Sequence, residues 1–345
     1  MSHDDATLSD GSAPTAGTAR RSLLRNVALA GAAATASALI PAGTAAASAR
    51  GHHGAPAPAT NADLDTSHAT PEVAKLFVRY FQDKTRADVD ATMSYFSRPK
   101  ITYIDATLGW PWYTWDELKA LFAQYMPTWP ATAKSYPTRI LGDARSAVVI
   151  FTDTPELFGH EIRPLGFVNF ERGKIVRWID YWDGRDFTMA DIVAQRTPAD
   201  KFPHDFKEPT VGEQAAPAMR RTAEALQTAF AAKNAQAAAR VFAYDAVFED
   251  RTLHATVVGR QHIQAYLGRA LNLLPYGPGS LVRHVVGSAV GGGYEWVNRH
   301  NPATHGGTAL ELDAAGRITR LTTAWDGSLV DKRVLTELLA RSIEE

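Results

Sequence analysis

The sequence predicts an α+β protein built from two copies of one small fold. A phrase of identical spacing occurs twice, running from Gly-Lys-Ile-Val-Arg to Trp-Asp-Gly at residues 173–184 and from Gly-Arg-Ile-Thr-Arg to Trp-Asp-Gly at residues 316–327. The expected helices and strands also follow the same order in both halves, and prolines break the chain between them. Because equal spacing over this length is hard to obtain by chance, we interpret the chain as an internal duplication.

Each copy is expected to begin with helices and to end with strands. The opening segment has apolar residues at the spacing of an amphipathic helix, and a short helix, a strand ending in an acidic residue and a further helix follow. These four elements are expected at residues 73–84, 87–96, 101–105 and 115–125, and in the second copy at 219–233, 235–242, 246–250 and 260–274. The remainder of each copy, through the Trp-Asp-Gly phrase, is expected to form strands.

The first 49 residues are predicted to be an export signal. Arg20 and Arg21 precede an uncharged run, rich in alanine and leucine, at residues 27–40, and residues 47–49 are Ala-Ser-Ala, a pattern that signal peptidase cleaves. The run is shorter than the ~20 residues that a membrane-spanning helix needs. The arginine pair resembles a twin-arginine signal, which implies the twin-arginine export machinery as a partner and a secreted protein. A general secretory signal or a lipid-exposed anchor is the alternative.

Composition changes divide the rest of the chain. Residues 50–70 are rich in Gly, Ala, Pro, Thr and His, which is typical of a flexible tether, and four prolines interrupt residues 198–217. The expected segments are a signal at 1–49, a tether at 50–70, a first domain at 71–196, a linker at 197–213 and a second domain at 214–345.

The composition excludes several classes of protein. The chain has no cysteine, so it contains no disulfide and no cysteine-ligated metal. Its 36 basic residues nearly balance 37 acidic ones, which does not favour nucleic acid or an anionic membrane as a partner. His300 and His305 are five residues apart, so they would lie on opposite faces of a strand, and no metal site is predicted.

The order of elements resembles the cone-shaped α+β barrel of the nuclear transport factor 2-like superfamily. Residues 173–183, Gly-Lys-Ile-Val-Arg-Trp-Ile-Asp-Tyr-Trp-Asp, look like the terminal strand of its SnoaL-like polyketide cyclase branch. The resemblance covers both copies and implies two tandem barrels, each a curved antiparallel sheet with N-terminal helices around an apolar cavity. Enzymes of this superfamily set one or two acids in that cavity and require no metal or organic cofactor. Because the superfamily also includes many non-catalytic binders, the resemblance is weak for function.

Asp180 is the first candidate for proton transfer. Trp178, Asp180 and Trp182 lie on one face of the expected strand, because alternate residues of a strand share a face. A carboxylate between two indoles is costly to ionise, and Asp180 falls where the SnoaL-like motif carries its acid. The alternative is a carboxylate paired with Arg163 or Arg177 on the outer face. The second copy has Thr323 at this place, which puts catalysis by that copy in doubt.

Both copies also bring an acid to the end of their first strand, Asp105 and Asp250. Such an acid could face the cavity or could only cap the following loop. His160 could act as a general acid or base, although a histidine in a hairpin is more often solvated. The aromatic segment at 108–115 could hold a flat ligand or serve as core packing. The residues expected to contact a ligand are Tyr103, Trp110, Trp112, Trp178, Trp182, Asp250 and Glu295.

Together these features predict a cofactor-free acid–base enzyme acting on an apolar small molecule, of the cyclase, isomerase, dehydratase or epoxide hydrolase type. The rival hypothesis is a non-catalytic protein that binds a small molecule or a partner outside the cell. Pairing of the two copies within one chain is expected to make the mature protein a monomer, in place of the homodimer common in the superfamily.

The leader yields the first testable prediction. Export should require the paired arginines, because a twin-arginine translocase recognises them, and the mature chain should begin within a few residues of Arg50. Mass spectrometry of the culture supernatant gives the mature N-terminus. Continued export of an Arg20→Lys, Arg21→Lys double variant would reject the twin-arginine route.

Overall fold

The computed structural model describes residues 63–343 except 186, 188, 190–192, 195, 199, 200, 204 and 210. The predicted signal at 1–49, with Arg20 and Arg21, lies outside the described residues, as do residues 50–62 of the expected tether. Within the described part of the chain, no helix is long and apolar enough to cross a membrane.

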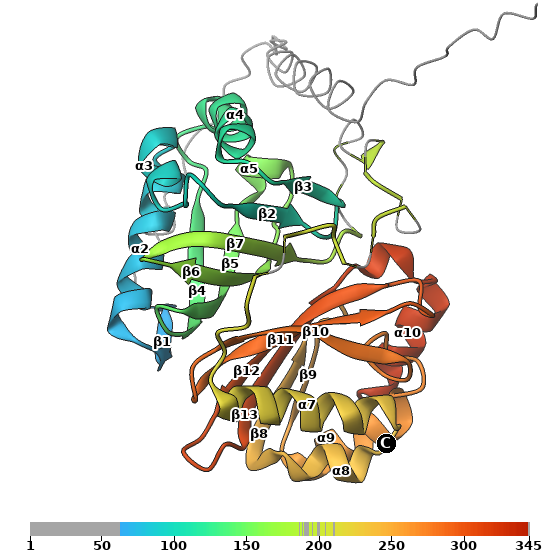
Figure 1. Ribbon diagram of the computed structural model, residues 1–345. Helices are drawn as coiled ribbons and strands as arrows, with labels where there is room; N and C mark the ends of the chain where they lie inside the picture. The colour runs from blue at the N-terminus through green and yellow to red at the C-terminus, as the bar shows by residue number, and fades with distance from the viewer. Residues whose placement is uncertain are drawn as a thin grey trace, which may run out of the picture. The chain divides into compact units, whose positions relative to one another are not determined.

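The first unit, residues 65–181, consists of one curved sheet with helices against one of its faces (Figure 1). Its helical elements are α2 (Pro71–Thr85), α3 (Val89–Ser94), α4 (Trp115–Tyr125), the 3-10 turn η2 (Met126–Thr128) and α5 (Pro155–Phe158). Its strands are β1 (Asp65–Ala69), β2 (Thr102–Asp105), β3 (Trp110–Trp112), β4 (Ser135–Gly142), β5 (Ser146–Asp153), β6 (Leu165–Glu171) and β7 (Lys174–Tyr181).

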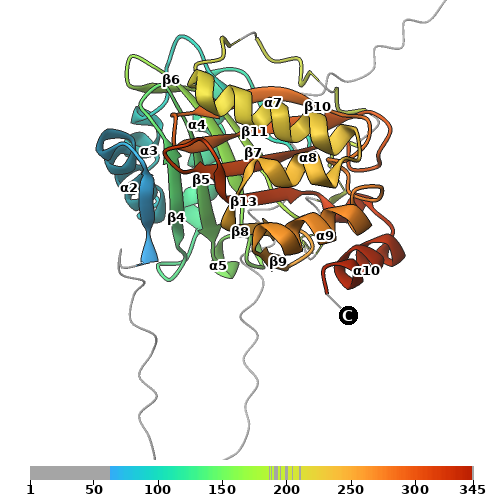
Figure 2. The ribbon, with the colours of Figure 1, turned by 90° about the horizontal axis from the view of Figure 1, so that it is seen from below.

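The second unit, residues 217–341, repeats this plan, with α7, α8 and α9 lying over one face of its sheet (Figure 2). Its helical elements are α7 (Pro217–Ala231), α8 (Ala235–Arg240), α9 (Arg260–Ala270), the 3-10 turn η3 (Gly327–Leu329) and α10 (Lys332–Arg341). Its strands are β8 (Phe242–Asp250), β9 (Ala255–Val258), β10 (Ser280–Gly287), β11 (Gly291–Asn298), β12 (His305–Leu312) and β13 (Ile318–Trp325).

The two sheets share one strand order. The first sheet runs β1-β4-β5-β6-β7-β2-β3 and the second runs β10-β11-β12-β13-β8-β9, so β4–β7 correspond to β10–β13, and β2 and β3 to β8 and β9. In both units the last strand pairs in parallel with a strand from the first half of the unit, β7 with β2 and β13 with β8. The expected α+β class, with two curved sheets and helices, is therefore confirmed.

Two segments expected to be spacers take part in the structure. Residues 65–69, assigned from the sequence to the tether, form β1 and pair in parallel with β4 at the sheet edge. Their polar side chains gave no strand signal, yet Arg139 of β4 lies 3.6 Å from the carboxylate of Asp65. In the expected linker, Phe202 and Phe206 are buried. Aromatic anchors separated by polar residues and prolines show no periodicity, which is why the sequence indicated only a linker.

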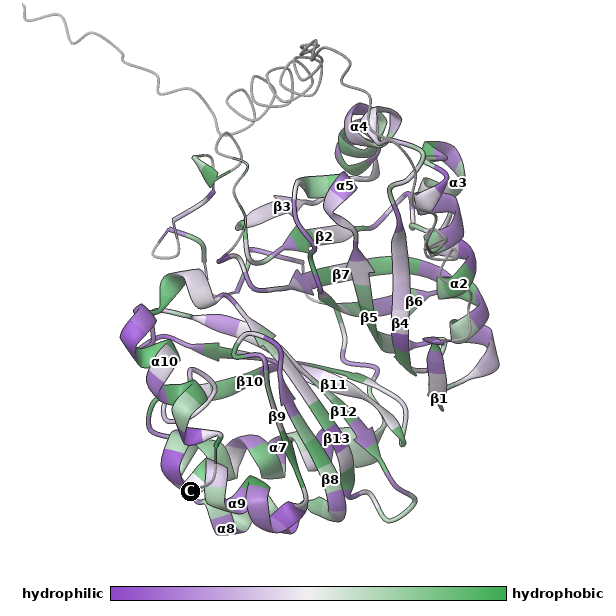
Figure 3. Cartoon of the chain, turned by 180° about the vertical axis from the view of Figure 1, so that it is seen from behind, coloured by the Kyte–Doolittle hydropathy of each residue, from purple (hydrophilic) through white to green (hydrophobic). Residues whose placement is uncertain are grey.

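The helices pack one face against each sheet. In Figure 3 helices such as α2 and α10 carry both hydrophobic and hydrophilic residues, as expected when one side faces a core. Val73, Phe77, Tyr80 and Phe81 of α2 are buried at helical spacing against strand residues such as Trp178. A ring such as Phe77 contributes about 2 to 3 kcal/mol by leaving water, so this face of α2 fastens the helix to the sheet.

The opposite faces of the two sheets meet in an interface. Apolar residues of the first unit, such as Phe167 and Ile179, form one buried cluster with Val286, Ala309 and Ala324 of the second. Gly307 is required there, since a Cβ atom at this position would lie 2.2 Å from the Phe167 ring. The two sheets therefore share one hydrophobic layer.

A buried ionic network crosses the same interface. The Arg177 guanidinium donates to both Glu295 carboxylate oxygens, at 2.5 and 2.9 Å, and Glu295 also accepts from Arg283 at 2.7 Å and from Tyr181 at 2.8 Å. Arg177 donates in addition to Glu208, at 2.7 Å. Burial alone would raise the pKa of Glu295, but the arginine charges outweigh it and lower that pKa below its usual value. The carboxylate therefore stays ionised without water.

This network yields a prediction about stability. Arg177→Met removes one of the two arginines that pair with the fully buried Glu295, and breaking a buried pair typically costs about 3–5 kcal/mol of unfolding free energy. The matched control is Arg145→Met, because Arg145 pairs with Asp143 while 60% exposed, and pairs of that kind contribute about 0–1 kcal/mol. Urea unfolding of both variants measures the difference. Equal losses would mean that the network does not hold the units together.

Candidate functional site

The first unit contains a cavity of about 130 Å³ between the helix-covered face of its sheet and α4. Its walls are mainly aromatic and include Trp110, Trp112, Phe122, Tyr125, Trp129 and Trp182. The charged side chains that line it are Lys84, Asp105, Asp153 and Asp180. The cavity is thus an apolar container with a small number of ionisable groups, the arrangement expected of a small-molecule site.

Asp180 lies on β7 with its carboxyl group in this cavity. The Trp178 indole N–H donates to Oδ1 at 2.5 Å and the Tyr103 hydroxyl donates to Oδ2 at 2.8 Å. Only 5% of Asp180 is exposed, and this burial raises its pKa to about 7, although both hydrogen bonds act to lower it. The group is therefore balanced between its acid and carboxylate forms near neutral pH.

The backbone of β6 makes room for this arrangement. Gly166 pairs with Asp180 across the sheet, and a Cβ atom at Gly166 would lie 2.9 Å from Trp178 Nε1 and 3.1 Å from Asp180 Oδ1. A larger residue would displace the indole from the carboxylate. Trp178 itself is 1% exposed and packs among Phe77, Tyr80 and other core rings, so it orients Asp180 and does not line the cavity.

Asp105 stands beside Asp180 because the two residues are register partners on β2 and β7. Its Oδ1 accepts from the Leu108 backbone N–H at 2.8 Å, and its carboxylate accepts from the Trp182 indole N–H at 3.1 Å. The sequence left open whether Asp105 caps the following loop or faces the cavity. In the structure it does both. Burial raises its pKa to about 6, and the proximity of the two carboxyls disfavours ionisation of both together.

A buried ion pair, missed by the sequence reasoning, completes the charged lining. Lys84 Nζ lies 3.1 and 3.3 Å from the two carboxylate oxygens of Asp153, and neither residue is more than 8% exposed. Lys84 continues the apolar face of α2, four residues after Tyr80. A lysine at a core-facing position was the available signal, but its partner is 69 residues away and only the fold brings them together.

The second unit keeps the loop-capping acid and loses the cavity acid. Asp250 accepts from the Leu253 N–H and the Trp325 indole N–H, as Asp105 does from Leu108 and Trp182. Its register partner on β13 is Thr323, the position equivalent to Asp180. The predicted equivalence of Asp180 and Thr323 is therefore correct.

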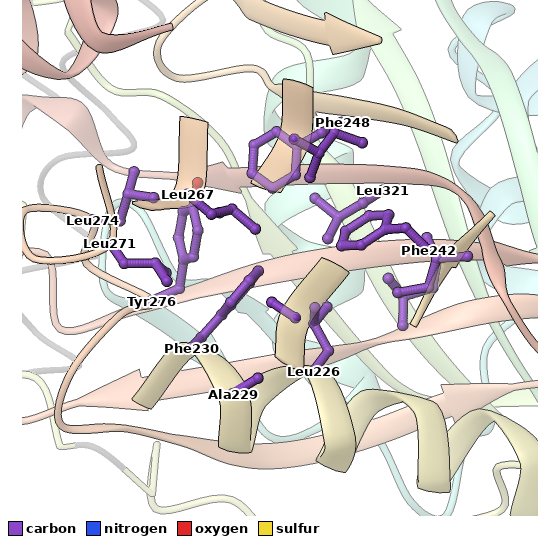
Figure 4. Close-up of a cluster of buried hydrophobic side chains, with 14 of the residues drawn as sticks. Leu226, Ala229, Phe230, Phe242, Phe248, Leu267, Leu271, Leu274, Tyr276 and Leu321 are labelled. Carbon is purple, nitrogen blue, oxygen red and sulfur yellow. The ribbon is translucent and has the colours of Figure 1, made fainter. Parts of the chain in front are cut away.

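Large side chains occupy the interior of the second unit. In Figure 4, Leu226 and Phe230 of α7 point toward Phe248 and Tyr276. The Phe230 and Tyr276 rings lie 5.7 Å apart, and the Tyr276 hydroxyl donates to Asp250 at 2.9 Å. The carboxyl of Asp250 is thus hydrogen-bonded on the side of the packed core, and the residue also borders the polar pocket that His160 lines.

The remaining predicted residues divide between the cavity and other places. Tyr103, Trp110, Trp112 and Trp182 line the cavity. Glu295 lies instead in the interface network, and His160 borders a separate, polar pocket with Arg163 and Arg251. The His160 ring contacts Phe187, whose ring lies on the cavity wall, at a centroid distance of 5.3 Å. Arg177 faces away from Asp180, so the alternative of an Asp180–Arg177 pair is wrong.

Comparisons with known proteins identify structural similarities of limited extent. No protein-family model matches the chain, and no curated protein matches its sequence. Similar solved structures include a putative ketosteroid isomerase from Kribbella flavida, at 18% identity, covering 39% of this chain and 96% of that chain with a TM-score of 0.28. A steroid delta-isomerase from Pseudomonas aeruginosa is 15% identical and covers 38% of this chain and 93% of that one, with a TM-score of 0.30. A SnoaL-like protein of unknown function from Burkholderia thailandensis is 10% identical and covers 34% and 100%, with a TM-score of 0.29.

The raised pKa of Asp180 predicts a pH dependence of stability. An aspartate in an unfolded chain has a pKa near 3.9, so between about pH 4 and 7 the folded protein binds more protons than the unfolded chain. The stability that comes from protonated Asp180 is full below pH 4 and is lost as the pH rises through 7. Asp180→Asn removes this loss. Its unfolding free energy relative to the parent should rise from pH 4 to 8, by at most about 4 kcal/mol.

Asp143→Asn is the matched control for this measurement. The hydrogen bonds from Arg145 lower the pKa of Asp143, although partial burial acts to raise it, so the control should change in the opposite direction and at lower pH. Denaturant unfolding across the pH range measures both variants. A flat difference for Asp180→Asn between pH 4 and 8 would show that Asp180 is ionised throughout in the folded protein.

Proposed function

We propose that this chain is a cofactor-free enzyme that acts on an apolar small molecule by acid–base catalysis in the cavity of its first unit. The observation that carries the proposal is Asp180, a carboxyl with a pKa near 7 inside an aromatic cavity. A group that is half protonated at working pH both gives and takes a proton efficiently. A plain binding pocket for an apolar ligand would gain nothing from a buried acid, which weakens folding.

The hydrogen bonds of Asp180 support a role in proton transfer. Each carboxylate oxygen accepts one hydrogen bond from a described residue, from Trp178 at Oδ1 and from Tyr103 at Oδ2, and a carboxylate oxygen can accept about two. Each therefore retains capacity for a substrate proton. Burial raises the pKa of Tyr103 further above its ordinary value, so the hydroxyl stays protonated and keeps donating. The carboxyl is held in one orientation while its protonation state changes.

Asp105 is the second acid of the proposed site. It stands beside Asp180, burial raises the pKa of both acids, to about 6 and about 7, and each charge disfavours ionisation of the other, so the pair shares its protons near neutral pH. Two acids with separated pKa values can act as a base and an acid in one reaction. Isomerisation, cyclisation, dehydration and epoxide opening can all use such a pair.

The second unit has a structural role in this proposal. The Thr323 hydroxyl is too weak an acid and too weak a base to transfer a proton at neutral pH, and the Asp250 carboxyl accepts from Tyr276, Trp325 and the Leu253 N–H. The second sheet instead covers the face of the first sheet that the cavity does not use. We further propose, from the leader and from this intramolecular pairing, that the chain is exported by the twin-arginine route and works as a monomer.

The decisive experiment compares Asp180→Asn with Thr323→Val. Small cyclic ketones and epoxides are incubated with each protein in D2O, and proton exchange or product formation is followed by NMR. Asp180→Asn should lower the rate by about 10² to 10⁴, because the amide keeps the shape of the carboxyl but exchanges no proton. Thr323→Val, at the equivalent position of the other unit, should leave it unchanged.

The same experiment separates the rival hypothesis of a binding protein. A binding protein would retain ligand in the parent and in both variants and would convert it in none. Full turnover by Asp180→Asn would remove this residue from the mechanism and leave Asp105 as the acid to test.

A further inference from the structure

The Lys84–Asp153 ion pair lies in the wall of the cavity that contains Asp180, and the proposed reaction gives this pair no part. Lys84 is 8% exposed and Asp153 is 4% exposed, so both charges are held away from water. A buried ion pair is often no more stabilising than apolar residues of the same volume. Stability alone therefore does not account for two opposite charges in an aromatic wall.

Hydrogen bonds hold the pair in one orientation. Lys84 Nζ donates to both carboxylate oxygens of Asp153, at 3.1 and 3.3 Å, and the Ser135 hydroxyl donates to Oδ1 of the same carboxylate. Ser135 and Asp153 are register partners on β4 and β5, whereas Lys84 lies in the last turn of α2. The ammonium group is thus fixed between a helix and the sheet, so the fold sets the position of its charge.

Aromatic rings in contact with one another lead from Lys84 to Asp180. Lys84 Nζ lies 5.1 Å from the centroid of the Phe151 ring, which lies 6.2 Å from the Trp178 ring. Phe81 provides a second such route, with distances of 5.7 and 6.4 Å. The Trp178 indole N–H donates to Asp180 Oδ1 at 2.5 Å. Because rings screen a charge much less than water does, Lys84 can influence Asp180 without touching it.

The groups around Asp180 act on it in opposite directions. Burial has the largest effect and raises the pKa of Asp180, whereas the hydrogen bonds from Trp178 and Tyr103 lower it. Of the nearby charges, that of Asp105 raises the pKa of Asp180 and that of Lys84 lowers it. Lys84 is the only basic residue in the described lining of the cavity. The titratable groups that share the cavity or act on Asp180 are Asp105 and Tyr103 of β2, Tyr80 and Lys84 of α2, Tyr125 of α4 and Asp153 of β5.

We propose that Lys84 is a positioning residue that keeps part of the Asp180 population in the carboxylate form, and that Asp153 limits this effect because its carboxylate pairs with the lysine. The inference rests on the proposed acid–base function and deepens it by naming the pair that regulates the proton-transferring group. An acid that stays protonated takes no proton, and one that stays ionised gives none, so a balance of the two forms serves both steps. Lys84 acts through its charge, and Asp180 remains the group that exchanges a proton.

Opposite changes of the two charges test the proposal. Lys84→Met removes the positive charge and should raise the pKa of Asp180, so that less of this carboxyl is ionised at pH 7. Asp153→Asn keeps the shape of the carboxyl, leaves the lysine charge unopposed and should lower the pKa of Asp180. A charge in contact typically shifts a carboxyl pKa by about 1–3 units, and one beyond a ring layer acts less. The ratio of ionised to protonated Asp180 should therefore change about 3- to 10-fold, in opposite directions.

Nuclear magnetic resonance of protein labelled with ¹³C at the aspartate carboxyls measures this ratio during a pH titration. The Asp180 signal is assigned by its loss in Asp180→Asn. The titrations are made with and without Asp105→Asn, because two neighbouring carboxyls otherwise titrate as a pair. Lys100→Met is the matched control, since the Lys100 side chain pairs with Glu171 while 41% exposed, and this variant should leave the Asp180 titration unchanged.

A double variant covers the case in which Lys84→Met folds poorly. Removal of the lysine alone leaves the Asp153 carboxylate buried without its cation, which is costly. Lys84→Met combined with Asp153→Asn removes both charges. The pKa of Asp180 should still rise, but by less than in Lys84→Met, because the negative charge of Asp153 no longer adds to the effect.

The titration needs no substrate, so its outcome is separate from that of the proposed function. An unchanged Asp180 titration in both Lys84→Met and Asp153→Asn would overturn the inference and leave the pair a structural role, even if the protein converts a substrate. Shifts in the same direction in both variants would also overturn it. Opposite shifts in a protein without any turnover would support the control of Asp180 by the pair and refute the enzyme. Where turnover is found, the pH–rate profile should move in the same direction as the titration in each variant.

Discussion

Strand β7 is buried on both faces, and its neighbouring side chains point to opposite sides of the sheet. Asp180 and Trp178 belong to the face that forms the cavity, whereas Arg177, Ile179 and Tyr181 belong to the interface with the second sheet. A shift of one residue in the pairing of β7 with β6 would exchange the two sets. The arginine would enter the aromatic cavity, and the acid would meet Glu295. The site and the interface therefore depend on one register.

The two units use the interior of the same fold in different ways. Both retain an acid that caps the loop after the first strand and accepts from the indole of the Trp-Asp-Gly phrase. The first unit adds Asp180 and leaves space beside it, while the second has Thr323 and fills its interior with Phe230, Tyr276 and other large residues. Filling a cavity stabilises a fold, and leaving one open costs stability. The packed unit can thus support the unit that carries the acids.

The cavity combines features that weaken the fold with features that suit reaction. Asp180 and Asp105 are held away from water, which keeps their pKa values near the pH at which proton transfer is efficient. Lys84 is neutralised by Asp153, so that no free positive charge remains in the described lining.

Local patterns were sufficient for the fold and for the first acid. Helical spacing, the repeated phrase and strand alternation predicted the two units, the shared face of Trp178, Asp180 and Trp182, and the equivalence of Asp180 with Thr323. Those signals depend on neighbours within one element, where side-chain direction follows from backbone geometry alone. The sequence did not determine which face of this strand points into the cavity, because either Arg177 or Asp180 could have pointed inward.

Contacts between distant segments required the tertiary structure. Lys84 and Asp153 are far apart in sequence, and no sequence pattern indicates that they pair. They meet because the fold brings Lys84 of α2 close to Asp153 of β5. Glu295 was expected near a ligand, yet the packing of the two sheets places it against Arg177. Phe206 and Glu208 lie in a segment that the sequence indicated was a linker. In the structure Phe206 is buried and Glu208 pairs with Arg177. The sequence by itself determined the duplication, the order of elements and the strand that bears the acid, since these are local. Which acids share a cavity and which charges neutralise each other were decided only by the tertiary structure, because burial and electrostatics depend on groups brought together from across the chain.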